Sequence, residues 1–261
     1  MKNALKELQK NPALAALALA RTKGLGRVTA ARLMEALGGP AEVYRLGPDE
    51  LADRTGLGLE LARRIHEPDR AGEAAEEFQK AAQHRIAVVP FGAADYPEEF
   101  GNLQDPPIAL YRRGTWNQKE RRLAVVGTRR PSRAGVVSAR LFAGELAASG
   151  AAIVSGLALG IDTLAHEAAL EARGRTYAVL GSGLLSVYPR ENRRLAERIA
   201  ESGALFSEFA LLEGPESFHF PLRNRLISVL GCGVVLVEAP RKSGAGRKSA
   251  AVVAEPAGGP P

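Results

Sequence analysis

The sequence predicts an α/β protein with a Rossmann-like parallel sheet, covered by helices on both faces and preceded by a small helical domain. After residue 85, short apolar runs that end in Gly or Ser alternate with helical stretches. Before it, Ala and Leu recur at three- and four-residue spacing, which is typical of helices. The chain has 261 residues and 46% apolar content, enough for one sizeable core and a smaller module.

Six apolar runs are the expected strands, at 86–90, 123–127, 151–155, 177–181, 204–208 and 234–238. Helices are expected between the last five strands, near 133–149, 160–173, 190–202 and 222–230. Fully apolar strands joined by helices indicate a parallel sheet that is buried on both faces. Right-handed crossovers then make the sheet Rossmann-like.

These elements divide the chain into a helical domain at 1–84 and a Rossmann-like domain at 85–239. Residues 240–261 are rich in Gly, Pro and Ala and follow no period, so we expect a disordered basic tail.

The formal net charge is +6, and the basic excess lies after residue 110. Most of the basic residues are arginines, which match phosphates, but a GC-rich genome explains the excess of Arg over Lys equally well.

Two segments of the helical domain resemble each other: KGLGRVTAARLMEAL from Lys23 and TGLGLELARRI from Thr55. Each places Gly-Leu-Gly directly before a helix, where free backbone N–H groups suit one phosphate oxygen. The pattern is typical of a helix-hairpin-helix or SAM-like module that binds nucleic acid without reading its sequence. Acidic residues surround both segments, which favours the interpretation of two tight turns in a helical bundle over actual DNA contact. DNA contact by these turns is therefore left open.

The carboxyl ends of parallel strands meet at one edge of the sheet, where ligands bind. Small residues and helix N-termini at such an edge bind anions, and arginine forks match phosphates. The candidate residues there are Gly127, Thr128, Arg129, Arg130, Arg133, Ser155, Gly156, Gly160, Gly181, Ser182 and Gly183. Aromatic residues make up only 5% of the chain, so base stacking is expected to contribute little; its candidates are Tyr111, Tyr188, Phe218 and Phe220, each of which could equally belong to the core.

Arg223, Asn224 and Arg225 fall at the start of the last expected helix. Arginines in a first turn oppose the helix dipole, so they need an anion nearby. That anion is either a ligand phosphate or a carboxylate such as Glu208 or Glu238. The two interpretations weigh equally for Arg223, whereas an internal pair is favoured for Arg225.

Other chemistries have little support in the sequence. The Gly-x-Gly-x-x-Gly fingerprint and the Gly-Lys-Ser/Thr pattern are both missing, and the four histidines have no paired spacing, so we expect neither a cofactor nor a metal. Ser155, Asp162 and His166 lie close in sequence without a nucleophile elbow, and His166 is interpreted as a packing residue. The single cysteine and the missing signal peptide predict a cytoplasmic protein without a membrane anchor.

Several stretches occur in an order that is specific: VVGTRRPSRAG, VSGLALGIDTLAHEAAL, AVLGSGLLSVYPREN, FPLRNRLIS and VEAPRKSG. On them the chain resembles the DNA-processing protein family DprA/Smf, over roughly residues 85–244. The resemblance implies a single-stranded DNA-binding protein of natural transformation (competence), without catalytic turnover, that protects incoming DNA and helps load the RecA-type recombinase in DNA recombination. It also implies a homodimer, and it makes Arg129 the best candidate for a phosphate contact.

After Gly244 the sequence departs from the family pattern, which continues with a helix and a strand that ends in a Pro-Gly turn. We therefore expect a truncated or frameshifted copy, which would lose sheet-edge material and part of the surface used for pairing. Two alternatives stay open. One is a nucleotide or phosphoribosyl hydrolase that uses Asp162, Glu208 or Glu238 as its acid. The other is an inactive remnant.

Overall fold

The computed structural model describes residues 2–239, and packing divides the chain into two compact units, one ending at Arg112 and the other starting at Arg113. The expected domain boundary after residue 84 stays a prediction, because a domain is defined by independent folding and a compact unit by packing alone. The tail expected at 240–261 lies outside the described residues.

The first unit is mainly helical, as predicted. Its elements are α1 (Lys2–Lys10), α2 (Pro12–Ala20), α3 (Arg27–Leu37), α4 (Pro40–Val43), α5 (Pro48–Thr55), α6 (Leu59–Ile65), α7 (Pro68–Gln83), β1 (Ala87–Pro90), α8 (Glu98–Gly101) and most of β2 (Ala109–Gly114), which ends just past the boundary. The apolar helix α2 forms the centre of this unit and packs against α1, α4 and α7. Asn11 caps it, since the side-chain oxygen of Asn11 accepts hydrogen bonds from the first-turn N–H groups of Ala13 and Leu14.

The two Gly-Leu-Gly segments form the turns that the sequence predicts. Gly24 and Gly56 take left-handed backbone angles, with φ of +85° and +69°. Gly26 and Gly58 are the N-caps of α3 and α6, and neither helix has a side-chain cap. This leaves the helix N-termini uncapped by side chains, as a phosphate-binding turn requires, and DNA contact there stays a prediction.

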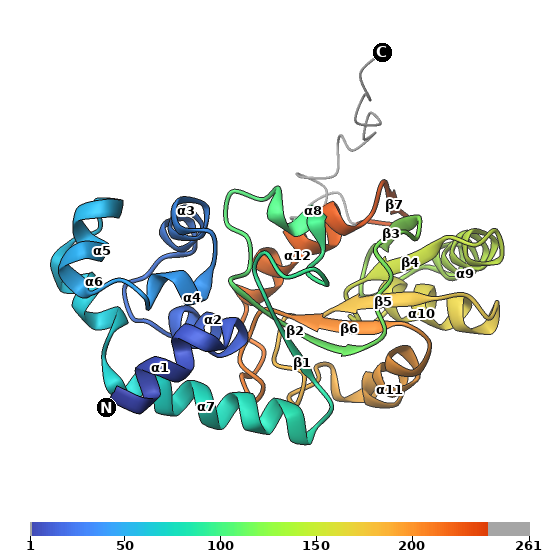
Figure 1. Cartoon of the computed structure of the whole chain (residues 1–261). Helices are drawn as coiled ribbons and strands as arrows, with labels where there is room; N and C mark the ends of the chain where they lie inside the picture. Colours follow the sequence, from blue (N-terminus) through green and yellow to red (C-terminus); the bar gives the residue numbers. More distant parts are fainter. Residues whose placement is uncertain (1, 240–261) are drawn as a thin grey trace, which may run out of the picture. The chain divides into compact units, whose positions relative to one another are not determined.

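The second unit contains β3 (Arg122–Val126), α9 (Arg133–Ala148), β4 (Ala152–Ser155), α10 (Ile161–Glu171), β5 (Thr176–Val179), a 3-10 turn (Arg190–Asn192), α11 (Arg193–Ser202), β6 (Ala204–Ser207), α12 (His219–Leu230) and β7 (Val234–Leu236). The strands follow the order β6-β5-β4-β3-β7, and each neighbouring pair is parallel. Helices α9, α10 and α11 pack side by side on one face, while α12 packs on β3, β4 and β5 from the other (Figure 1). The predicted Rossmann-like class is confirmed.

All six expected strands are present, and β2 is an additional strand that pairs with β1 in antiparallel register. The sequence analysis missed it because Pro106 and Pro107 precede the short apolar run and two arginines end it. Helix α12 begins at His219, earlier than expected. Pro221 is tolerated there because it lies in the first turn, where a backbone N–H has no partner within the helix.

The strand order places a topological switch point between β3 and β7. The chain moves from β3 through β4 and β5 to β6, and then α12 carries it back to β7 on the other side of β3. Ligands of doubly wound sheets bind at the carboxyl ends of the strands beside such a point. Among the described helices, none has the length and apolar content needed to cross a membrane.

His166 lies fully buried on α10 beneath the sheet. Its Nδ1 lies 2.7 Å from the Thr176 hydroxyl, which donates its one proton to the Ile153 carbonyl at 2.8 Å. Nδ1 must therefore carry the proton of this contact. The buried Nε2 has no hydrogen-bond partner among the described residues, which suits a neutral ring with an unprotonated Nε2. Burial, together with the smaller effect of the Arg223 charge, lowers the pKa of His166 to about 3. His166 is thus a packing residue, as the sequence analysis expected.

The neutral His166 predicts a loss of stability in acid. The folded-state pKa lies below the ordinary value of about 6.5, so below that pH the unfolded chain binds the extra proton and the free energy of unfolding falls. One such group contributes a slope of at most about 1.4 kcal/mol per pH unit. His166→Gln should reduce this slope between about pH 5 and pH 6.

The slope is measured by urea unfolding followed through Trp116, the only tryptophan of the chain, which lies in the second unit with His166. His84→Gln, on the surface of the first unit, is the matched control and should keep the wild-type slope. Equal slopes for the wild type and His166→Gln would contradict the account.

Candidate nucleic-acid interface

The turn after β3 has a fixed backbone. Thr128 N donates a hydrogen bond to the carbonyl of Glu238 at 2.7 Å, and Ile161 N donates to the carbonyl of Thr128 at 3.1 Å. The Thr128 hydroxyl oxygen accepts a hydrogen bond from Arg130 N at 3.2 Å. The strands β3 and β7 and the helix α10 therefore together hold the segment that carries the arginines.

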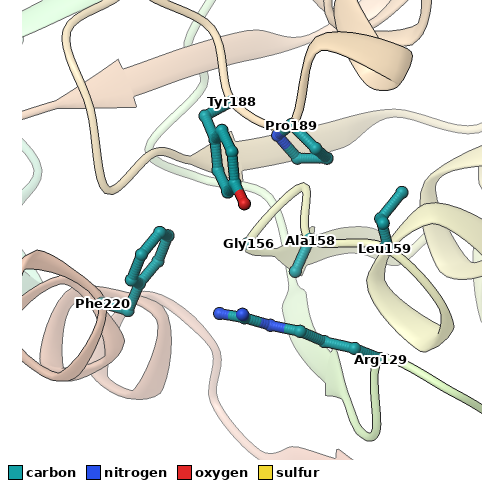
Figure 2. Close-up of a pocket in the computed structure, with 7 residues that line it drawn as sticks. All are labelled: Arg129, Gly156, Ala158, Leu159, Tyr188, Pro189 and Phe220. Carbon is teal, nitrogen blue, oxygen red and sulfur yellow. The ribbon is translucent and has the colours of Figure 1, made fainter. Parts of the chain in front are cut away.

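Arg129 is exposed and lies over an aromatic ring. Its guanidinium carbon is 5.0 Å from the ring centroid of Phe220, on α12. Figure 2 shows the side chain extended across a pocket, with the guanidinium toward Phe220 and the ring of Tyr188 on the opposite side. The centroids of Tyr188 and Phe220 are 6.0 Å apart, and Tyr188 is 44% exposed.

The pocket has a volume of about 310 Å³, counting the space open to solvent. Its lining residues are Arg129, Gly156, Ala158, Leu159, Tyr188, Pro189 and Phe220. One exposed cation and two aromatic rings thus share a shallow hollow at the carboxyl ends of β3, β4 and β5. Such a surface suits a phosphate together with a neighbouring planar base.

Further exposed arginines flank the pocket. Arg130 and Arg133 belong to the same turn as Arg129, and Arg190 directly follows Pro189 of the pocket. Arg193 and Arg194 continue along the first turn of α11. Within residues 2–239, none of these five guanidinium groups forms an ion pair or a hydrogen bond. Arg190, Arg193 and Arg194 were not predicted from the sequence. The signal was present, because arginines in the first turn of an expected helix are what singled out Arg223.

Arg223, in contrast, is 3% exposed and points into the protein. Its Nη1 donates to the carbonyl of Gly156 at 2.5 Å and also to the carbonyl of Val179. A Cβ atom at Gly156 would overlap the guanidinium, so this glycine makes room for Arg223. Burial lowers the pKa of Arg223 to about 10, although the Asp162 charge opposes this effect. The structure therefore supports the internal interpretation of Arg223.

Asp162 binds the backbone amides that follow β4. Its Oδ2 accepts hydrogen bonds from Gly156 N at 3.2 Å and Ala158 N at 3.3 Å. Burial raises the pKa of Asp162, while the Arg223 charge and these N–H groups lower it. The sequence analysis expected these amides to bind a ligand anion, but an internal carboxylate already satisfies them.

The other small residues of the strand ends also have internal roles. Ser155 is fully buried, and its hydroxyl donates to the carbonyl of Val125 at 2.6 Å. Gly160 has φ of +82°, and a Cβ atom there would overlap the Thr128 carbonyl, so it allows two loops to approach closely. The Arg225 guanidinium donates to Glu208 at 2.6 Å, which confirms the predicted internal pair.

The predicted site residues thus fall into three groups by exposure. Arg129, Arg130, Arg133 and Asn224 are exposed, and Gly127, Thr128 and Gly160 are half-buried. The enclosed residues are Ser155, Gly156, Gly181, Ser182, Gly183 and Arg223. Of the enclosed group, Gly156 lines the pocket, and contact of each residue with DNA stays a prediction.

The role of Arg223 predicts a large effect on stability. Arg223→Met removes the donors of two buried carbonyls and leaves the Asp162 charge without its cation, which typically costs about 3–5 kcal/mol. Arg130→Met, at an exposed guanidinium, is the control and should change the free energy of unfolding by less than about 0.5 kcal/mol. Both are measured by urea unfolding with Trp116 fluorescence. Wild-type stability in Arg223→Met would show that this guanidinium does not hold the strand ends.

Comparison with known proteins identifies the family of the chain. Residues 87–254 match the model of the family described as DNA recombination-mediator protein A. The chain is 40% identical over 161 residues to the DNA processing protein DprA of Bacillus subtilis, covering 61% of this chain and 54% of that protein. It is 41% identical over 194 residues to the protein Smf of Escherichia coli, covering 73% and 51%. The chain spans about half the length of the curated relatives it matches.

Two solved structures are also similar. DNA processing protein A from Streptococcus pneumoniae superposes with a TM-score of 0.74 at 33% identity, over 86% of this chain and 77% of that one. The protein from Helicobacter pylori, whose structure describes its unique single-stranded DNA binding mode, has a TM-score of 0.55 at 34% identity, over 62% and 73%. Because the family model matches more than half of the sequence, the chain belongs to the DNA recombination-mediator protein A family, whose relatives carry the names DprA and Smf.

Proposed function

We propose that this chain binds single-stranded DNA at the pocket beside Arg129, protects incoming strands in natural transformation and helps to load a RecA-type recombinase onto them. The observation that carries the proposal is an exposed guanidinium placed over the ring of Phe220 and facing the exposed ring of Tyr188. The single-stranded DNA binding mode described for the Helicobacter pylori relative supports the substrate class. A second copy of the chain and the recombinase are proposed as partners from family membership, and a cytoplasmic location goes with them.

Two kinds of interaction would hold the strand. The phosphates would bind the exposed, unpaired guanidinium groups of Arg129, Arg130, Arg133 and Arg190, which release counterions from the nucleic acid. Four such contacts give a slope of about −3 for log affinity against log salt. A base would stack on the exposed face of Tyr188, which every base can use, so the binding would be tolerant of sequence.

We propose binding without catalytic turnover. The three carboxylates considered for a hydrolase all have partners within the chain. Asp162 accepts two backbone N–H groups, Glu208 pairs with Arg225, and Glu238 accepts from Ser132. A general acid needs access to the reacting group, and each of these carboxylates is held by protein donors instead.

Arg129→Glu tests the proposed contact directly. The reversal removes one phosphate contact and adds a repulsive charge, so the Kd for a labelled oligothymidine should rise at least tenfold in fluorescence anisotropy. The melting temperature should stay unchanged, because the side chain is exposed and forms no ion pair with the described residues. Arg121→Glu is the matched control, since Arg121 is exposed at the amino end of β3, on the opposite edge of the parallel strands.

A salt titration separates the two kinds of interaction. Arg129→Ala should reduce the magnitude of the salt slope by about 0.7, the value for one phosphate of a single strand. Tyr188→Ala should weaken binding by about 1–3 kcal/mol with the slope unchanged. If Arg129→Glu binds the oligonucleotide as the wild type does, the proposed function is wrong.

A further inference from the structure

The Glu238 carboxylate lies at the N-terminus of α9, where the chain leaves β7. Its Oε2 accepts hydrogen bonds from Ser132 N and from the Ser132 hydroxyl, both at 3.0 Å. The Ser132 hydroxyl oxygen in turn accepts Gly135 N at 3.1 Å, which caps the helix. Glu238 is thus bound to the N-terminus of α9 through Ser132, which lies 106 positions before it in the sequence.

The first turn of α9 is shaped to admit this carboxylate. Gly135 is buried, and a Cβ atom there would overlap Oε2 of Glu238. A negative charge at a helix N-terminus is favourable because it meets the positive end of the helix dipole. In Rossmann-like folds this position, after the first strand of the parallel unit and beside the switch point, normally binds a ligand phosphate. Here the chain itself supplies the anion.

Glu238 also holds the other end of the arginine turn, because its backbone carbonyl accepts Thr128 N at 2.7 Å. One residue therefore anchors the turn at Thr128 and at Ser132, and Arg129 and Arg130 lie between the two anchors. Both arginines are exposed and, among the described residues, form no ion pair. The backbone that carries them is fixed while their side chains stay available.

We propose that Glu238 is a positioning residue for DNA binding: it acts as an internal anion that fills the phosphate position of α9 and holds the arginine turn. The inference rests on the proposed function. DNA phosphates then bind the arginine side chains and not the backbone amides of α9. A mononucleotide phosphate, which would need those amides, is excluded from the same position.

Two substitutions separate positioning from charge, because the two effects have opposite signs. Glu238→Gln keeps an oxygen that accepts from Ser132 and removes a negative charge near the arginines, so the oligothymidine affinity should equal or exceed that of the wild type. Glu238→Ala removes the charge and the side-chain contacts with Ser132, while its backbone carbonyl still accepts Thr128 N, and we expect about tenfold weaker binding despite the more positive surface. A residue that acted only by charge would give tighter binding in both variants.

Ser132→Ala provides a second test without any change of charge. It removes the hydroxyl that donates to Glu238 and accepts from Gly135, so binding should weaken in the direction of Glu238→Ala. This variant keeps the inference testable if Glu238→Ala does not fold. Circular dichroism establishes that each variant is folded before its affinity is compared.

The anisotropy series contains the wild type, Arg129→Glu and the three variants at one ionic strength. Suppose that the wild type binds and Arg129→Glu does not: the proposed function then stands. If Glu238→Ala and Ser132→Ala also bind as tightly as the wild type, the positioning role is overturned. If the wild type itself does not bind, the proposed function fails. The effect of inorganic phosphate on the melting temperature then still decides whether Glu238 fills the anion position.

That experiment uses inorganic phosphate alone. Removal of the carboxylate opens the N-terminus of α9, so phosphate should raise the melting temperature of Glu238→Ala relative to chloride at matched ionic strength. The wild type should show no such difference between the two salts. Equal responses of the wild type and Glu238→Ala would overturn the proposal that Glu238 occupies a phosphate position.

Discussion

The candidate site depends on one buried guanidinium. Arg223 reaches from α12 to the carbonyls of Gly156 and Val179, which end or follow two neighbouring parallel strands, and its charge lies near the buried Asp162. A buried guanidinium is costly unless carbonyls and an opposite charge surround it, and here both are present. Because Arg223 takes the space beside Gly156, it forms the inner wall behind the pocket that Arg129 borders.

The same principle recurs at other strand ends of the second unit. The anion positions that a Rossmann-like sheet offers are filled from within, by Asp162 on the amides after β4 and by Glu238 on the first turn of α9. Arg225 is likewise neutralised by Glu208. What is left for a ligand is a set of exposed arginine side chains around two aromatic rings. A long polyanion matches such a surface better than a nucleotide cofactor, which needs free amides at a helix N-terminus.

Much of this arrangement follows from local patterns in the sequence. The apolar runs predicted six of the strands, and the glycines and arginines after them predicted which residues meet at the carboxyl edge of the sheet. The strand β2 was missed because prolines and arginines interrupt its pattern. Arg193 and Arg194 of α11 were not predicted, because arginines at the start of a helix are equally typical of an ordinary solvent-exposed helix face.

The sequence by itself determined the α/β class and the alternation of strands and helices. It also determined that Gly127, Ser155 and Gly181 meet at one edge, because parallel strands place their carboxyl ends together. Only the tertiary structure decided which charges face solvent. Arg129 and Arg223 look alike in the sequence, yet one is exposed and the other is enclosed by carbonyls. The physical reason is that a buried charge is stabilised by hydrogen bonds to groups distant in the chain, such as Gly156 for Arg223 and Ser132 for Glu238, and no local pattern encodes those contacts.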